Sequence, residues 1–344
     1  MKKIPKLLKQ AEILKNLEFW RKKLPATNGY RKLNSEEINK LENQGNSCEK
    51  WDDIDVAQDF STSRIKNCFF SGKSKLPSFF GSVRTPEGLS VPTGLYDSFL
   101  DGCVLENCHI YRVSTLTKTI VEAGAVIRNT GSIISSGATR FGNGISLNIG
   151  SEAGGRNILS YTELDLPTAE LILLSQKDTD LQKDFKGSIE DFALELESSI
   201  SIICKGAKIC NTTTLRNVWI GPESVIDGAT KIQNTSVYSS LEQPTKISDG
   251  AIVKHSILQW GSKVTSHASV INSILLEASS ATKQAKINHS IIAPNSHIMQ
   301  GEVTSSLLGP FVGFHHQALL ISALWPEGMG LSLIHISEPT RLGF

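Results

Sequence analysis

Apolar residues recur every six positions over much of the chain. Neither the 3.6-residue period of an α-helix nor the two-residue period of a half-exposed strand produces this spacing. A longer period lies above it, because tripeptides that begin at Ser256, Ser273, Ser290 and Ser306 follow one another at intervals of 17, 17 and 16 residues. About three six-residue units would then form one turn of a repeat. The residues at this spacing are Val121, Ile127 and Ile133; Ile203, Ile209 and Leu215; Ile220, Ile226 and Ile232; and Ile252, Leu258, Val264, Val270 and Leu276.

This repeat predicts an all-β solenoid. Each unit would supply one short strand and a corner, with one aliphatic side chain directed inward, and three units would enclose a triangular prism. The pattern resembles the left-handed parallel β-helix of hexapeptide-repeat proteins. The left hand is implied by the resemblance, because the general rule for parallel crossovers favours the right hand.

Two stretches outside the repeat predict helices. In residues 165–199 the six-residue spacing vanishes, Pro167 suits the first turn of a helix, and 168–182 and 188–197 are expected to be two helices separated at Gly187. This insertion is acidic, with nine acidic and three basic residues from Asp165 to Ser198. Before the repeat, 6–23 is expected to form an amphipathic helix with Leu7, Ala11, Leu14 and Leu17 on one stripe.

The expected organisation follows from these patterns. It is a helical and irregular N-terminal cap (1–62), a first part of the β-helix (63–164), the acidic helical insertion (165–199), a second part of the β-helix (200–314), a truncated irregular segment (315–330) and a non-native tail (331–344). The tail resembles a translated sequencing adapter, which implies a chain cut near Gly330. The N-terminal helix is expected to cover the open end of the solenoid. Its excess of eight basic over two acidic residues in 1–23 leaves a membrane-surface or partner-binding role as the alternative.

Charge and cysteine content exclude several classes of protein. Lys plus Arg at 35 against Asp plus Glu at 34 gives a net charge of +1, so no global field attracts nucleic acid or an anionic membrane. The chain has no apolar run long enough to span a membrane and no secretory h-region, so a cytoplasmic location is expected. The six cysteines show no C-x-x-C pair, so reduced thiols and no metal site are expected.

A glycine-rich segment is the candidate substrate-binding site. The chain reads Thr-Arg-Phe-Gly-Asn-Gly at 139–144 and Glu-Ala-Gly-Gly-Arg at 152–156. Backbone N–H groups and guanidinium groups could hold a phosphate or carboxylate there. The alternative is that the glycines serve a turn and that Glu152 pairs with an arginine. Neither a P-loop nor a dinucleotide-binding pattern is present. The candidate binding residues are Arg140, Phe141, Asn143, Glu152 and Arg156.

Histidines near the end of the repeat are the candidate catalytic residues. His315 and His316 lie in 309–317, where the regular spacing ends, and a histidine titrates close enough to neutral pH to act as a general base. The alternative is a pair of surface histidines. A further set, His255, Asn272, His289 and Ser305, is expected to stack in one column as a polar ladder. Its two histidines would be two coils apart, roughly 10 Å, too far to share a metal ion.

Several phrases carry a resemblance to a known family. They are residues 30–38, Phe-Gly-Asn-Gly at 141–144, Gly-Gly-Arg at 154–156, residues 309–317 and Trp-Pro-Glu-Gly at 325–328. With them the chain resembles, from about 29 to 330, a bacterial family of unknown function that is built on hexapeptide repeats and has longer intact members. Some members are labelled UDP-N-acetylglucosamine pyrophosphorylase or acyltransferase. The family itself implies no established reaction.

The wider hexapeptide-repeat superfamily implies a transferase. Its members are commonly acyl-CoA or acyl-carrier-protein dependent trimers, with the site between neighbouring subunits and a histidine base. By this analogy we expect a cytoplasmic homotrimeric acyltransferase-like protein that uses acetyl-CoA or another acyl-CoA on a sugar or sugar-nucleotide, with no nucleic-acid or membrane partner. The alternatives are a sugar-nucleotide-binding or nucleotidyltransferase-associated protein, although no nucleotidyl-transfer module precedes the repeats, and a non-catalytic β-helix scaffold.

Overall fold

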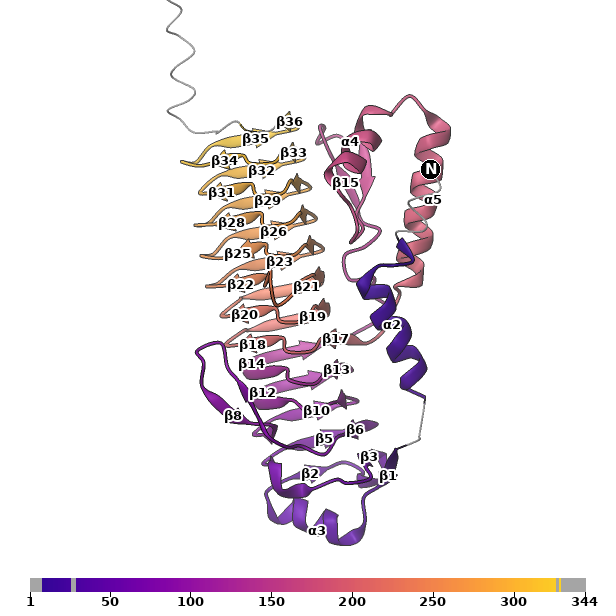
Figure 1. The fold of residues 1–344 in the computed structure, drawn as a ribbon, viewed down its shortest axis with the longest axis vertical. Coiled ribbons are helices and arrows are strands. Elements are labelled where there is room, and N and C mark those ends of the chain that lie inside the picture. The colour runs from indigo at the N-terminus through magenta and orange to yellow at the C-terminus, as the bar shows by residue number, and fades with distance from the viewer. Residues whose placement is uncertain (1–7, 26–28, 326–327, 329–344) are drawn as a thin grey trace, which may run out of the picture.

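The computed structural model describes residues 8–25, 29–325 and 328. Its main feature is a 32-stranded, parallel-rich sheet whose short strands are stacked in a tall column (Figure 1). The architecture is mostly β and is compatible with a β-helix or solenoid. The predicted tail at 331–344 lies outside the described residues.

Strand pairing divides the sheet into three columns, which the chain visits in turn. The first column contains β4 (Ile65–Lys66), β9 (Gly94–Tyr96), the first parts of β12 (His109–Thr117) and β14 (Val126–Ile134), β18 (Lys208–Cys210), β20 (Val225–Asp227), β22 (Lys246–Ser248), β25 (Lys263–Val264), β28 (Ser280–Thr282), β31 (His297–Met299) and β34 (Gly313–Phe314).

Within a turn, the strand of the second column comes after the strand of the first column along the chain. The second column contains β2 (Ser47–Cys48), β5 (Phe69–Ser71), β10 (Phe99–Asp101), the later parts of β12 and β14, the first parts of β19 (Thr214–Ile220) and β21 (Lys231–Val237), then β23 (Ile252–Lys254), β26 (Ser269–Ile271), β29 (Lys286–Asn288), β32 (Glu302–Thr304) and β35 (Leu319–Ile321).

The third column completes each turn of the chain. It contains β1 (Tyr30–Lys32), β3 (Ile54–Ala57), β6 (Ser74–Leu76), β11 (Val104–Leu105), β13 (Thr119–Val121), β17 (Ser201–Ile203), the later parts of β19 and β21, β24 (Ile257–Leu258), β27 (Ile274–Leu275), β30 (Ile291–Ile292), β33 (Leu307–Leu308) and β36 (Leu324–Trp325).

The registers explain the longer period in the sequence. Val253 pairs with Val270 and Val270 with Ile287, so strands in one column are 17 residues apart. The residues that enter the core in this turn are Val253, Leu258, Val264 and Val270, at spacings of five, six and six. The uniform spacing of six was therefore wrong at two positions. Ile252 is half-buried beside Val253. Leu276 packs outside the main core, in a second apolar cluster that residues of the N-terminal helix and of the insertion also form. Both differences arise because the corner between the second and third columns is one residue shorter than the others.

The N-terminal end of the column is closed by other elements than predicted. β1 pairs antiparallel with β3, and α3 (Ser35–Asn43) lies at this end of the column (Figure 1). Asn34 and Glu37 form a capping box that fixes the start of α3, and Leu41 of this helix is buried in the main core. Two short 3-10 helices, η1 (Trp51–Asp53) and η2 (Thr62–Arg64), and a hairpin of β7 (Ser82–Arg84) and β8 (Ser90–Pro92), complete the region.

The N-terminal helix lies on the side of the column, not over its end. α2 (Glu12–Lys23) buries Leu14 and Leu17 as predicted, while the predicted stripe residue Leu7 lies outside the described residues. The Trp20 indole N–H and the Asn16 amide both donate to the Glu122 carboxylate, each at 2.7 Å. These polar contacts to the third column explain the difference, since hydropathy alone gives no docking position.

The insertion is larger than the sequence indicated. Strands of the main sheet stop at Ile134 and resume at Ser201, so residues 135–164, which were expected in the β-helix, also lie outside it. These residues form a hairpin of β15 (Ser146–Asn148) and β16 (Asn157–Leu159), which precedes α4 (Leu166–Leu174) and α5 (Thr179–Glu195).

The predicted helix break was also wrong. Gly187 lies within α5, and the two helices separate between Ser175 and Asp178, where the Asp178 side chain accepts from the Leu181 N–H and caps α5. A capping aspartate thus decides the boundary, and the glycine is tolerated inside the helix at a modest cost.

The segment from 315 is regular, not irregular. β35 and β36 continue the second and third columns up to Trp325, and Phe314 and Leu320 occupy inward positions. The aromatic side chain at 314 hid this turn from a search for aliphatic residues.

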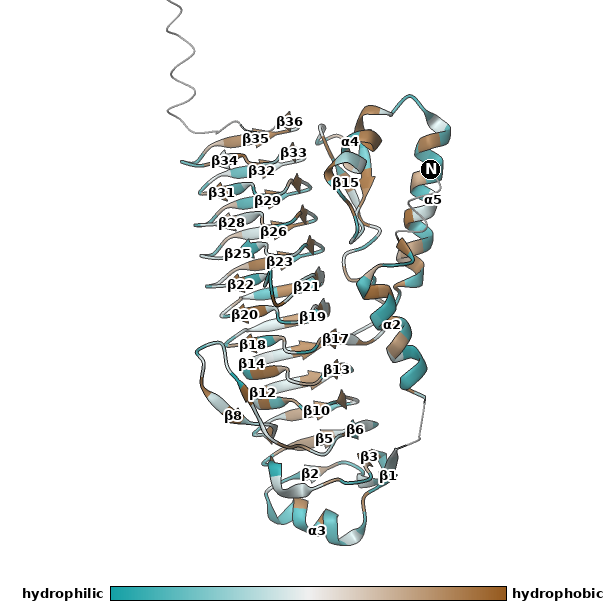
Figure 2. Ribbon diagram, viewed as in Figure 1, coloured by the Kyte–Doolittle hydropathy of each residue, from teal (hydrophilic) through white to brown (hydrophobic). Residues whose placement is uncertain are grey.

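The third column is apolar on both of its faces. Ile257, Ile274, Ile291 and Leu307 point out of the main core into a second cluster, whereas the residues that follow them point inward. The insertion and α2 cover this outer face with buried residues such as Phe141 and Trp20. Figure 2 shows the hydrophobic residues on α4 and along the strands. Burial on both faces explains the paired apolar residues of the repeating tripeptides.

Candidate functional site

The site is built at the corner where the insertion leaves the sheet, between the second and third columns. One residue of each turn at this corner has a positive φ, which short polar side chains tolerate better than branched ones. The Asn234 amide lies 3.1 Å from Nδ1 of His255, and the Asn272 amide lies 3.2 Å from Nε2 of His289. The predicted polar ladder is confirmed. Its members with positive φ are Asn217, Asn234, His255, Asn272, His289, Ser305 and Ser322.

The insertion turns back over this ladder at Gly142. The Ser236 hydroxyl donates to the Phe141 carbonyl at 2.7 Å, which brings the glycine against the corner. Gly142 has a φ of +87°, and a Cβ atom there would lie 2.8 Å from the Ser256 carbonyl oxygen and 2.9 Å from that of Asn234. Only glycine satisfies both the backbone conformation and the close approach.

A surface hollow of about 400 Å³ opens beside this turn, and we call it the corner hollow. Arg140 contributes a guanidinium to this hollow, and its Nε and Nη2 donate to Oε2 of Glu197 at 3.2 and 3.1 Å. Both side chains are about 40% exposed or more, so this ion pair is weak and an anionic ligand can compete for the guanidinium. The lining residues are Ala138, Thr139, Arg140, Gly142, Asn143, Gly144, Ile145, Glu197, Asn234 and His255.

Two of the predicted binding residues hold the loop together. The Asn143 amide group donates to the Arg140 carbonyl at 2.9 Å, and its oxygen accepts from the Thr162 N–H at 3.0 Å, so this side chain is already engaged. Phe141 is fully buried in the second cluster and faces no solvent. Both residues therefore support the position of Arg140.

His255 is a functional candidate that the sequence pattern did not identify, because the pattern predicted it only as a member of the polar ladder. Burial lowers its pKa, and the positive charges of Lys254 and Lys231 lower it further, so the imidazole is neutral at pH 7. Oδ1 of Asn234 is buried and has no partner among the described residues. With that amide rotated, Oδ1 would accept from Nδ1–H of His255 and leave Nε2 as a proton acceptor. The insertion between 134 and 201 was the available signal, because it leaves from this corner.

Glu152 and Arg156 lie away from Arg140. The hairpin runs along the ladder, so that the Gly150 N–H donates to the Ser305 carbonyl at 2.6 Å and the Glu152 N–H to the Ser322 hydroxyl at 3.1 Å. Both side chains are exposed, and neither lines the corner hollow. The two arginines of the predicted site therefore belong to opposite ends of the hairpin.

His315 and His316 lie at a different corner, between the first and second columns. Their ring centroids are 6.1 Å apart. Burial lowers the pKa of His315, with smaller contributions from His316, His297 and Lys283, and its Nδ1 is buried without a partner among the described residues. Neither histidine lines the corner hollow. Their catalytic role stays a prediction.

The rest of the described chain offers few other reactive groups. Residues 8–25, 29–325 and 328 contain no cluster of three or more histidine, cysteine or acidic side chains suited to a metal ion. In the same ranges no helix has the length and apolar character required to cross a membrane. All six cysteines are free, and burial raises the pKa of Cys68, Cys103 and Cys210 to about 12.

Comparison with known proteins places the chain in a family. The sequence profile of the family described as Domain of unknown function (DUF4954) matches residues 30–327. An uncharacterised protein of Treponema pallidum (strain Nichols) is 33% identical over 308 residues, which is 86% of this chain and 42% of that protein. The chain thus spans less than half the length of this relative.

A solved structure shows only a weak likeness. It is a provisionally named acetyltransferase of Desulfovibrio desulfuricans G20, with 13% identity and a TM-score of 0.16 over 77% of this chain and 64% of that one.

Proposed function

Because the chain belongs to the family Domain of unknown function (DUF4954), whose description assigns no reaction, we propose its function from the corner hollow. The proposal is an acyltransferase-like protein that binds a sugar or sugar-nucleotide there and acylates one of its hydroxyl or amino groups from acetyl-CoA or another acyl-CoA. The proposal rests on one observation. Arg140, whose guanidinium can exchange its Glu197 partner for an anionic ligand, and His255, whose imidazole is neutral, line the same hollow.

The proposed fold is a left-handed parallel β-helix of hexapeptide repeats. The three columns and the 17-residue registers support a triangular coil of three short strands. The left hand comes from the resemblance of the sequence pattern to hexapeptide-repeat proteins. The proposal retains a homotrimer, in which a neighbouring copy would cover the open side of the hollow.

Each group in the hollow has a chemical task. Arg140 would bind a phosphate or pyrophosphate oxygen of the acceptor, for which a guanidinium is well suited. His255 would accept the proton of the acceptor hydroxyl or amine. The freed oxygen or nitrogen forms a bond to the thioester carbonyl carbon, the carbon–sulfur bond breaks, and the coenzyme A thiolate takes the proton back from the imidazolium.

The test is release of free coenzyme A thiol from acetyl-CoA in the presence of UDP-sugar acceptors. The His255→Ala variant should lose about 10²- to 10⁴-fold in rate, which is the usual contribution of a general base. His289→Ala is the matched control, because it removes the same kind of ladder hydrogen bond two turns away from the hollow and should leave the rate within twofold. Equal rates for wild type and His255→Ala would refute the assignment. If thiol release instead disappears in His315→Ala, the general base would be His315, as the sequence analysis predicted.

Binding without turnover favours the second candidate, a sugar-nucleotide-binding protein. The exposed ion pair of Arg140 with Glu197 supports it, since anion binding at this guanidinium needs no catalytic group. A calorimetric signal with UDP-N-acetylglucosamine, together with no thiol release from any acyl-CoA, would select this candidate. If neither a calorimetric signal nor thiol release is observed, the non-catalytic scaffold is favoured.

A further inference from the structure

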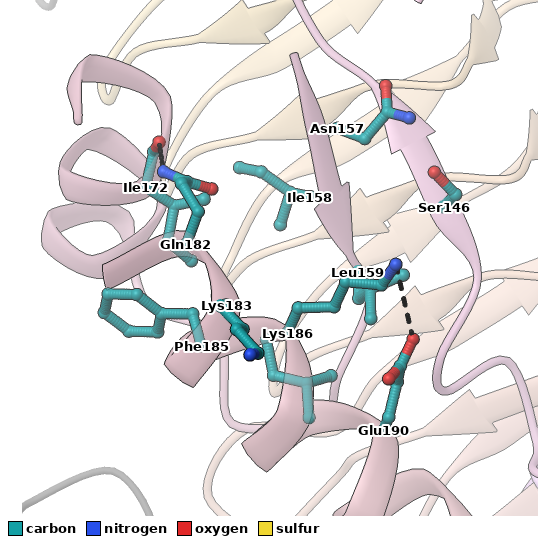
Figure 3. A pocket seen from close by; sticks show the side chains of 11 residues that line it. Ser146, Asn157, Ile158, Leu159, Ile172, Gln182, Lys183, Phe185, Lys186 and Glu190 are labelled. Carbon is teal, nitrogen blue, oxygen red and sulfur yellow. Dashed lines mark hydrogen bonds and ion pairs between the residues drawn. The ribbon is translucent and has the colours of Figure 1, made fainter. Parts of the chain in front are cut away.

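A second cavity lies inside the insertion, between β16 and α5, and we call it the insertion pocket. It has a volume of about 430 Å³. Figure 3 shows its lining residues, which come from both strands of the hairpin and from both helices. None of them lines the corner hollow, so the two sites have no residue in common.

The floor of the insertion pocket is aliphatic and aromatic. Ile158, Ile172, Phe185 and Ile189 line it, and each is at most 6% exposed. These four side chains give the pocket an apolar floor, and we call this floor the apolar slot. An apolar surface of this kind suits a hydrocarbon chain. The volume is within the range of small-molecule sites.

The rim of the insertion pocket is polar and carries two lysines. Lys183 and Lys186 are exposed on successive turns of α5 at the mouth. Lys186 is 3.8 Å from Glu190 in an exposed pair, which contributes little stability. Lys183 forms no ion pair with any described residue. Two ammonium groups beside an apolar slot therefore favour an anionic head group with a hydrocarbon tail.

These lysines are unusual in their surroundings. The segment from Asp165 to Ser198 contains only three basic residues, and two of them are at this mouth. The third, Lys177, is exposed in the connection between α4 and α5 and does not line the pocket. The basic charge of an otherwise acidic insertion is thus concentrated where the apolar slot opens.

We propose that the insertion pocket binds a single-chain amphipathic anion, a fatty acyl chain with a carboxylate or phosphate head. The alkyl chain occupies the slot over Ile158, Ile172 and Ile189, and the head group lies between Lys183 and Lys186. This function does not depend on catalysis at the corner hollow, because the two sites are lined by different residues.

Calorimetric titration of the full chain with the saturated carboxylates from hexanoate to tetradecanoate, all below their critical micelle concentrations, tests the chain-length requirement. Burial of each added methylene should tighten binding about fourfold until the slot is full, after which affinity levels off. Decyltrimethylammonium, with a similar tail and the opposite charge, should bind at least tenfold more weakly than decanoate.

The lysine contribution is tested with surface variants. Lys183→Glu combined with Lys186→Glu should weaken decanoate binding about tenfold or more, and the effect should shrink in high salt. Lys177→Glu is the matched control and should bind as wild type does. A Leu159→Trp variant, which narrows the slot from β16, should weaken binding of dodecanoate more than that of hexanoate.

The same assays identify the source of the head group. Tighter binding of lysophosphatidate than of the carboxylate with the same chain would assign a phospholipid-derived ligand, and the reverse would assign a free fatty acid. Affinity that does not change with chain length, or equal affinity of the double lysine variant and Lys177→Glu, would overturn the proposal.

Discussion

The side-chain amide of Asn234 lies 3.1 Å from Nδ1 of His255, and both residues line the hollow that also contains Arg140. This pair belongs to a ladder that runs along one corner of the sheet. The corresponding pair of Asn272 and His289 does not line the corner hollow. At Asn234 and His255 the insertion folds back beside the pair and adds a guanidinium, so the same polar contact becomes part of a candidate site.

The close approach of Gly142 to the ladder should be essential for the position of Arg140. Gly142→Ala should lower the thermal unfolding midpoint more than Gly155→Ala does. Both glycines have positive φ, so each substitution carries a backbone cost of about 1–2 kcal/mol. Only Gly142 also has carbonyl oxygens within 3 Å of the added Cβ, whereas nothing lies within 4 Å of a Cβ at Gly155. Equal midpoints for the two variants would show that the contact is not tight.

The docking of α2 should depend on pH through Glu12. Burial raises the pKa of Glu12 from its ordinary value of 4.5 to about 7, with further contributions from Glu163 and Glu122 and an opposing one from Lys15. The folded protein therefore binds this proton more tightly than the unfolded chain. The stabilisation is fully present below pH 4.5 and is lost as pH rises through about 7.

A Glu12→Gln variant tests this dependence. The neutral amide should raise the thermal unfolding midpoint at pH 8 and reduce the slope of the midpoint between pH 4.5 and 7. Part of the slope should remain, because burial also raises the pKa of Glu163. Glu18→Gln, on the exposed side of α2, is the control and should follow the wild-type curve. A Glu12→Gln curve parallel to that of wild type would rule out this carboxyl as the cause.

Asn16 should be the polar residue that fixes α2 on the third column. Its amide donates to Glu122 at 2.7 Å and its oxygen accepts from the Trp219 indole N–H at 3.1 Å. Asn16→Ala leaves the indole N–H of a fully buried Trp219 without an acceptor, which should destabilise the protein by about 1–3 kcal/mol. Hydrogen exchange of the α2 backbone amides should also be faster in this variant than in wild type. If Glu18→Ala accelerates exchange as much, the network does not hold the helix.

The homotrimer can be tested independently of activity. Size-exclusion chromatography with light scattering should give three times the mass of one chain. A mass of one chain would contradict a site completed by a neighbouring copy, and would restrict the proposal to residues of a single corner hollow.

The repeat was the most predictable part of the fold. Ile203, Ile209 and Leu215 were expected to face inward and are fully buried in the main core. The spacing failed at Ile252, because the inward residues Val253 and Leu258 on either side of a corner are five positions apart and not six. It also missed the turn at Phe314, where an aromatic residue replaces the aliphatic one. Local spacing predicts the strands well but cannot fix the length of each corner.

The site was less predictable, because it depends on tertiary contacts. The segment around Arg140 could be identified from its glycines, but nothing in the sequence shows that it folds back onto Asn234 and His255. Glu152 and Arg156 were grouped with it by sequence proximity, yet the hairpin carries Glu152 to Ser322, and neither residue lines the corner hollow. The consecutive apolar residues Ile257 and Leu258 were used only as a marker of the longer period, and the structure shows that one faces the main core and the other the second cluster.

Calorimetric titration of the intact chain with UDP-N-acetylglucosamine shows whether the corner hollow binds an anionic sugar-nucleotide. We expect saturable binding to wild type that weakens at least tenfold in Arg140→Ala and is unchanged in Arg216→Ala, an exposed arginine of the second column that does not line the hollow. Because the ion pair of Arg140 with Glu197 is exposed, its loss should not unfold the protein. Equal affinity in the two arginine variants, or no binding to wild type, would refute a sugar-nucleotide site at Arg140.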